Sequence, residues 1–103
     1  MNFKDKLAEY IELLDCTAKD LCESSGLSAA TISRYRSGER IPEANTENLI
    51  NLIKGIVCIA QNKEIADVTV ESVSAAFSPF VINSMVDMKH FQINFNTLLT
   101  MLS

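Results

Sequence analysis

The chain has 103 residues, of which 48% are hydrophobic, and its formal net charge is −4 at pH 7. This length fits one small domain, at most with an appendage, and the apolar content is sufficient for a core. The acidic balance argues against a non-specific nucleic-acid coat, which is normally basic. The longest apolar run, residues 56–60, is much too short to span a bilayer, so we expect no membrane partner.

The three cysteines, Cys16, Cys22 and Cys58, form no CxxC pair and have no histidine at ligand spacing. We expect Cys22 and Cys58, which have apolar neighbours, to be small buried residues of a reduced, cytoplasmic protein. The sequence contains no nucleophile elbow, metal-ligand motif or phosphate-binding loop, and His90 stands alone. We therefore expect no enzymatic activity, no metal site and no cofactor.

The first two predicted helices are marked by their ends. Asn2 can cap a helix whose apolar residues recur at helical spacing, and this stripe consists of Phe3, Leu7, Tyr10, Ile11 and Leu14. Thr17 is the next candidate N-cap, with Asp20 three residues on in a pattern like a capping box. We expect Leu21 and Cys22 to face inward and Gly26 to end this helix in the left-handed conformation.

The next two helices follow from the same kind of signal. Ser28 is expected to cap a third helix of about nine residues, and Gly38 is expected to end it. Pro42 prevents an early restart. Asn45 or Thr46 then opens a fourth helix that runs to about residue 60, with its core stripe at Leu49, Leu52, Ile53 and Ile56.

After residue 61 the pattern is less regular. Residues 65–73 partly alternate, as a strand would, but Thr69 could also cap a helix over 70–77. We favour the helix, because a lone strand has nothing to pair with. A further helix is expected at 81–88, followed by a strongly apolar segment at 91–102. The sequence thus predicts an all-α bundle in residues 1–60 and a helical extension in residues 61–103.

The two ends of the chain share a pattern. A shift of 88 residues places six apolar positions between Phe3 and Leu14 onto apolar positions between Phe91 and Leu102, with Asp5 against Ile93 as the clear mismatch. One interpretation is that the last segment begins a second, similar domain. The alternative is that two amphipathic helices with the same spacing align by accident.

The third predicted helix presents a narrow polar face. At about 100° per residue, with Ile32 as the buried reference, four residues point outward: Ala30, Ser33, Arg34 and Ser37. Thr31 flanks them, and Tyr35 should pack inward. Between residues 31 and 42, three arginines face only Glu39, which gives a local charge of +2. Small residues beside one long cation suit the major groove of DNA, where base edges must approach closely.

Residues 3–56 resemble the lambda-repressor-like (Cro/XRE-type) helix-turn-helix family. The residues that carry the resemblance are Thr17, Leu21, Gly26-Leu27-Ser28, Thr31-Ile32-Ser33-Arg34, Gly38, Pro42, Leu49 and Ile53. The resemblance implies a compact bundle of about five helices and a dimeric, sequence-specific transcriptional regulator that binds double-stranded DNA. It further implies base contacts from Ala29, Ala30, Thr31, Ser33 and Arg34, and contacts to the DNA backbone from Thr17, Ser28, Ser37 and Arg40.

The chain departs from the family pattern at several positions. Ala18 stands where many relatives carry glutamine, and Ala29 and Ala30 offer only methyl groups to the bases. Arg36 stands where relatives commonly have an acidic residue, and it could either contact a phosphate or pair with Glu12 or Asp15. These departures keep a second interpretation open, in which the chain is a protein-interaction module that has the fold but not the DNA readout.

The apolar residues after position 65 exceed what a small bundle requires. We expect them to form a homodimer contact, with two copies of the domain on half-sites about one helical turn of DNA apart. The residues concerned are Phe77, Phe80, Val81, Met85, Phe91, Phe95 and Leu98.

Overall fold

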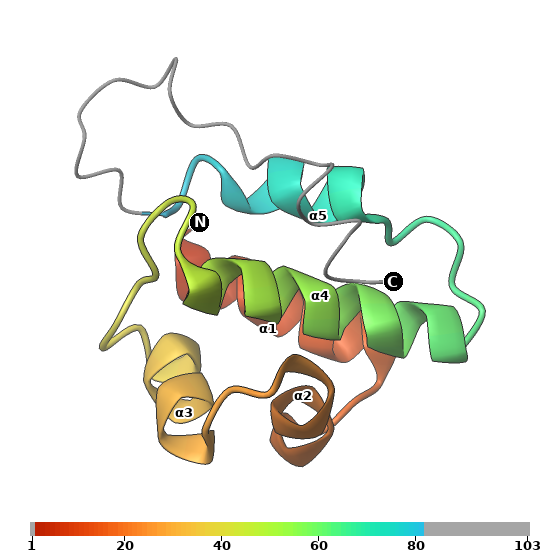
Figure 1. The fold of residues 1–103 in the computed structure, drawn as a ribbon, viewed down its shortest axis with the longest axis horizontal. Coiled ribbons are helices and arrows are strands. Elements are labelled where there is room, and N and C mark those ends of the chain that lie inside the picture. Colours follow the sequence, from red (N-terminus) through yellow and green to blue (C-terminus); the bar gives the residue numbers. More distant parts are fainter. Residues whose placement is uncertain (1, 82–103) are drawn as a thin grey trace.

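The computed structural model describes residues 2–81, which form five α-helices and no strand. The elements are α1 (Phe3–Leu14), α2 (Ala18–Ser25), α3 (Ala29–Ser37), α4 (Glu47–Asn62) and α5 (Val70–Phe77). Helices α1 and α4 lie side by side in the middle, α2 and α3 pack on one side of them, and α5 packs on the other (Figure 1). The prediction of an all-helical chain is confirmed for this part of the protein.

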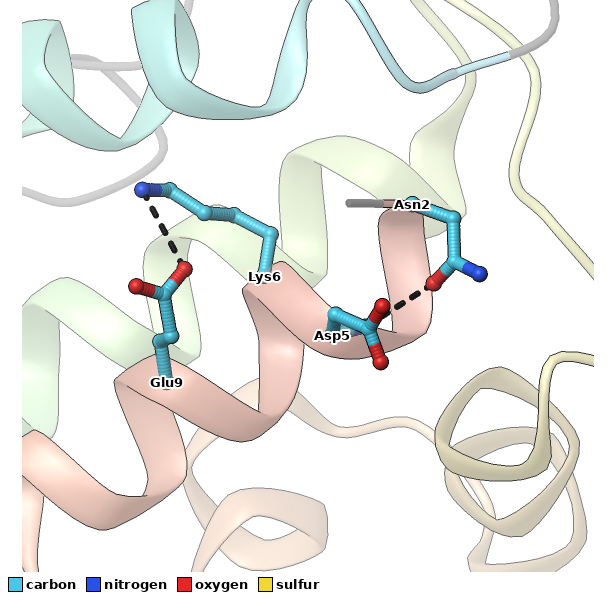
Figure 2. Close-up of polar contacts among 4 residues, drawn as sticks. All are labelled: Asn2, Asp5, Lys6 and Glu9. Carbon is cyan, nitrogen blue, oxygen red and sulfur yellow. Dashed lines mark hydrogen bonds and ion pairs between the residues drawn. The ribbon is translucent and has the colours of Figure 1, made fainter.

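Each helix begins at a side chain that caps it. The capping oxygen accepts a hydrogen bond from the backbone N–H three residues on, over 3.1–3.4 Å. Figure 2 shows the first of these contacts, from the Asp5 N–H to Asn2 Oδ1. The caps are Asn2, Thr17, Ser28, Thr46 and Thr69.

The predicted helix limits are confirmed at almost every cap. Of the two candidates for α4, Thr46 is the cap, because it has the extended backbone that this position requires, whereas Asn45 has φ = 58°. Helix α4 extends to Asn62, slightly beyond the expected end. The predicted choice of a helix over a strand after Thr69 is also correct, and a capping box between Thr69 and Ser72 fixes its start.

One continuous core joins all five helices. Phe3 at the start of α1 stacks edge-on against Tyr35 of α3, with ring centroids 5.8 Å apart, and lies 5.0 Å from the ring of Phe77 in α5. All three side chains are fully buried. Phe77 was expected among the dimer contacts, but its ring fills the core between α1 and α5 and is not available to a second copy.

Several side chains differ from their predicted burial. Cys22 and Cys58 are only half-buried, because each lies at the edge of its helix's buried stripe. Leu13 is 57% exposed. The final predicted segment at 91–102, nearly all of the predicted helix at 81–88 and the possible repeat lie outside the described residues.

Candidate nucleic-acid interface

The site is built on α3, whose position is fixed by the short connection from α2. Gly26 ends α2 with φ = 78°, a left-handed conformation that glycine adopts without strain. The buried Ser25 hydroxyl then accepts the Leu27 N–H over 3.1 Å, and the Leu27 side chain enters the core. Two residues after the glycine, Ser28 begins α3. The chain therefore reverses within a few residues, and α3 starts at a defined place against α2.

Two buried side chains set the rotation of α3. Ile32 and Tyr35 are 0% and 1% exposed, so the side of the helix that carries them faces α1 and the core. Every other residue of α3 is exposed except Thr31, which is intermediate. The predicted outward positions, Ala30, Ser33, Arg34 and Ser37, are thus all exposed, and the expected inward position of Tyr35 is confirmed.

The hydroxyl groups on and around α3 differ in what they can still donate. Ser28 Oγ donates to Thr31 Oγ1 over 2.9 Å, and Ser37 Oγ donates to the Arg34 carbonyl over 3.1 Å. Each hydroxyl has one proton, so in this arrangement both serines use it within α3 and its cap. Thr17 and Thr31 use their side-chain oxygens as acceptors in these contacts, and the Ser33 side chain makes no hydrogen bond to any other residue in 2–81.

The three arginines have no acidic partner within residues 2–81. Within the described residues, Arg34, Arg36 and Arg40 form no ion pair and no side-chain hydrogen bond, and all three are exposed. The alternative of a structural pair between Arg36 and Glu12 or Asp15 is therefore wrong. The Arg40 N–H donates to the Arg34 carbonyl over 3.2 Å, which holds the loop after Gly38 against the end of α3.

The start of α2 is ordered by reciprocal capping. The Thr17 N–H donates to Asp20 Oδ2 over 2.9 Å, and the Asp20 N–H donates to Thr17 Oγ1 over 3.1 Å. The bond from the Thr17 backbone lowers the pKa of the Asp20 carboxyl, because it favours the ionised form. Lys63, the C-cap residue of α4, supports the same region, since its Nζ donates to the carbonyls of Leu14 and Asp15 over 2.6 and 2.7 Å.

A groove of about 850 Å³ runs beside α3, between it, α1 and α2. Its α3 wall is formed by four residues proposed from the sequence, Ala29, Ser33, Arg36 and Ser37. The groove also contains two lysines that sequence reasoning missed, Lys4 and Lys19. The residues that line it are Lys4, Ala8, Ile11, Glu12, Ala18, Lys19, Cys22, Ala29, Ser33, Arg36 and Ser37.

Helical spacing could have pointed to Lys4. Lys4, Ala8, Ile11 and Glu12 follow the i, i+4, i+7, i+8 pattern of one helix face, which is repeated by Ala29, Ser33, Arg36 and Ser37 on α3. That these two faces border the same groove depends on how α1 packs against α3, and the spacing alone does not reveal it.

No family model, curated protein or solved structure matches this chain. Within residues 2–81, no helix is long and apolar enough to cross a membrane. The same part of the chain contains no group of three or more histidine, cysteine or acidic side chains that could hold a metal ion. The pKa of the Cys16 thiol is raised, and burial is the largest cause of this shift. The thiol is therefore protonated at neutral pH.

Proposed function

We propose that residues 2–81 form a DNA-binding domain of a transcriptional regulator, in which α2 and α3 act as a helix-turn-helix. In this proposal α3 lies in the major groove, and Ala29, Ala30, Thr31, Ser33 and Arg34 face the bases. The observation that carries the proposal is the outward face of α3, where small side chains surround an exposed Arg34 that forms no ion pair with any residue the structure describes. The resemblance of residues 3–56 to the lambda-repressor-like family supports the same function.

In this proposal, some of the hydrogen-bond donors on and around α3 contact bases and others contact phosphates. Arg34 is the residue best suited to read a guanine, because a guanidinium can bind the two acceptors of that base edge together. The alanines can contribute contacts to thymine methyl groups only. Thr17, Arg36 and Arg40 keep protons for phosphate oxygens, whereas Ser28 and Ser37 act mainly by capping α3 and by bonding its last turn.

A monomer of this size offers few cations to DNA, and the chain as a whole is acidic. We therefore propose that two copies bind together, on half-sites separated by about 34 Å, one turn of the duplex. The apolar residues after Phe77 are the proposed contact between the copies. Sedimentation of the full chain with and without duplex DNA tests this part, and a monomer bound alone to a single half-site would contradict it.

The test of DNA binding uses two arginine variants and a salt series. The wild type should bind mixed duplex DNA with an affinity that falls as salt rises, with a slope of about −0.9 for each phosphate contacted. Selection from a random pool should then show that Arg34→Ala relaxes the sequence preference by about 1–3 kcal/mol at one base position. Arg40→Ala should weaken all sequences equally.

A second function is favoured by the short side chains at Ala18, Ala29 and Ala30. These give little direct base readout, so the same surface could serve as a protein-interaction module. The salt series separates the two functions. Undetectable binding of duplex DNA at low salt would favour the interaction module, whereas steep salt dependence would favour the regulator.

A further inference from the structure

We infer that the groove between α1, α2 and α3 receives the phosphate backbone of one DNA strand, with Lys4 and Lys19 as phosphate-binding residues. This inference rests on the proposed function and extends it to a second surface, beside the face that reads the bases. The groove and that face share Ala29 and Ser33, so the two surfaces are continuous.

The charge of the groove fits a polyanion. Three cations line it, Lys4, Lys19 and Arg36, against a single carboxylate from Glu12. None of the three cations forms an ion pair with another described residue. Without an ion pair inside the described part of the chain, their side chains can reach phosphate groups, which supply most of the salt-dependent affinity of DNA-binding proteins.

Two other hollows on the described surface have the opposite balance. One of them is lined by a single cation, Lys63, and by two carboxylates, from Asp20 and Glu23. The other, between α1 and the start of α5, contains one lysine and three carboxylates, from Lys6, Glu9, Glu12 and Asp67. The groove is thus the one of these three hollows in which cations outnumber carboxylates, and an acidic protein can still offer a basic surface to DNA.

The Lys4 side chain passes beside the end of α3. A Cβ atom on Gly38 would lie 2.9 Å from Lys4 Cδ, so the stem of the lysine rests directly against the glycine that ends α3. The carbonyl end of a helix carries partial negative charge and favours a nearby cation. The exposed Lys4 side chain therefore lies beside the proposed recognition helix, at the rim of the groove.

Lys6 provides a matched control on the same helix. It is two residues from Lys4, about 200° around the helix axis, and its Nζ lies 3.5 Å from Glu9 Oε2. Figure 2 shows this pair, which lines the hollow between α1 and α5 and not the groove beside α3. Loss of the Lys6 charge should therefore leave a phosphate contact in the groove intact.

The experiment compares Lys4→Gln, Lys19→Gln and Lys6→Gln in the full chain, with mixed-sequence duplex DNA as the probe. We expect each of the first two variants to reduce the slope of log K against log salt by about one unit, without a change in sequence preference. Lys4→Arg should restore the wild-type slope. Glu12→Gln should tighten binding of every sequence, because it removes the one carboxylate in the groove.

The outcomes distinguish this inference from the function on which it rests. If Arg34→Ala relaxes the sequence preference but Lys4→Gln and Lys19→Gln keep the slope of Lys6→Gln, the inference is wrong and the regulator stands. If the wild type binds no duplex DNA, both fail. If poly-glutamate binds through Lys4 and Lys19 while duplex DNA binds independently of them, the groove takes an acidic protein segment, and the inference is again overturned.

Discussion

Gly55 of α4 lies directly against Ser25, the last residue of α2. A Cβ atom on Gly55 would be 2.7 Å from Ser25 Cβ and 2.9 Å from the Ser25 backbone nitrogen. Both residues are buried, and the contact lies one residue before the Gly26 turn that leads into α3. The close approach of these two helices therefore helps to place the proposed recognition helix.

The first prediction concerns Gly55→Ala. Alanine favours a helix over glycine by about 1 kcal/mol, but its methyl group would overlap the Ser25 backbone, and such overpacking costs roughly 1–3 kcal/mol. We expect a net loss of stability, measured as a lower urea midpoint. The exposed Gln61→Ala on the same helix is the control and should change little. A Gly55→Ala protein more stable than the wild type would show that α2 and α4 can move apart freely.

The second prediction concerns two serines of α5. The Ser74 hydroxyl is buried and has no hydrogen-bond partner among residues 2–81. Ser74→Ala removes this unsatisfied group and should be neutral or stabilising by up to about 2 kcal/mol. Ser72→Ala should instead destabilise by about 1 kcal/mol, because Ser72 Oγ accepts the Thr69 N–H over 2.9 Å. An unfolding midpoint lower for Ser74→Ala than for Ser72→Ala would contradict these roles of the two hydroxyl groups.

The third prediction concerns pH and the Asp20 carboxyl. Hydrogen bonding from Thr17 lowers the pKa of this group from its ordinary value of 3.8. The ionised form therefore stabilises the folded chain above pH 3.8, and this contribution is lost as the pH falls through the lowered pKa. Asp20→Asn should be less stable than the wild type at neutral pH, and the difference between their urea midpoints should shrink below pH 3.8. A difference that stays constant with pH would rule out this role.

Local rules were sufficient to predict the described helices. A cap such as Ser28 or Thr69 followed by an apolar stripe, and glycines at 26 and 38, determine where the chain can begin and end a helix. The outward face of α3 followed from its single buried reference, Ile32, because a helix nine residues long has few ways to face a core.

Features that depend on packing between helices could not be predicted in this way. The contact of Gly55 with Ser25 and of Lys4 with Gly38 join residues 30 or more positions apart, and no local pattern specifies them. Phe77 is a large apolar residue and was expected at an interface. Its place in the core follows only from the position of α5 on α1. The groove beside α3 is likewise a product of tertiary packing.

The most direct test of the account is an NMR titration of the labelled full chain with duplex DNA, with amide shifts mapped onto the fold. The proposed function predicts that the amide signals of Ala30, Ser33 and Arg34 shift most. The amide signals of exposed residues of α5, such as Glu71 and Ala75, should keep their chemical shifts. Shifts concentrated on α5, or no shifts at low salt, would contradict the claim that the outward face of α3 binds DNA.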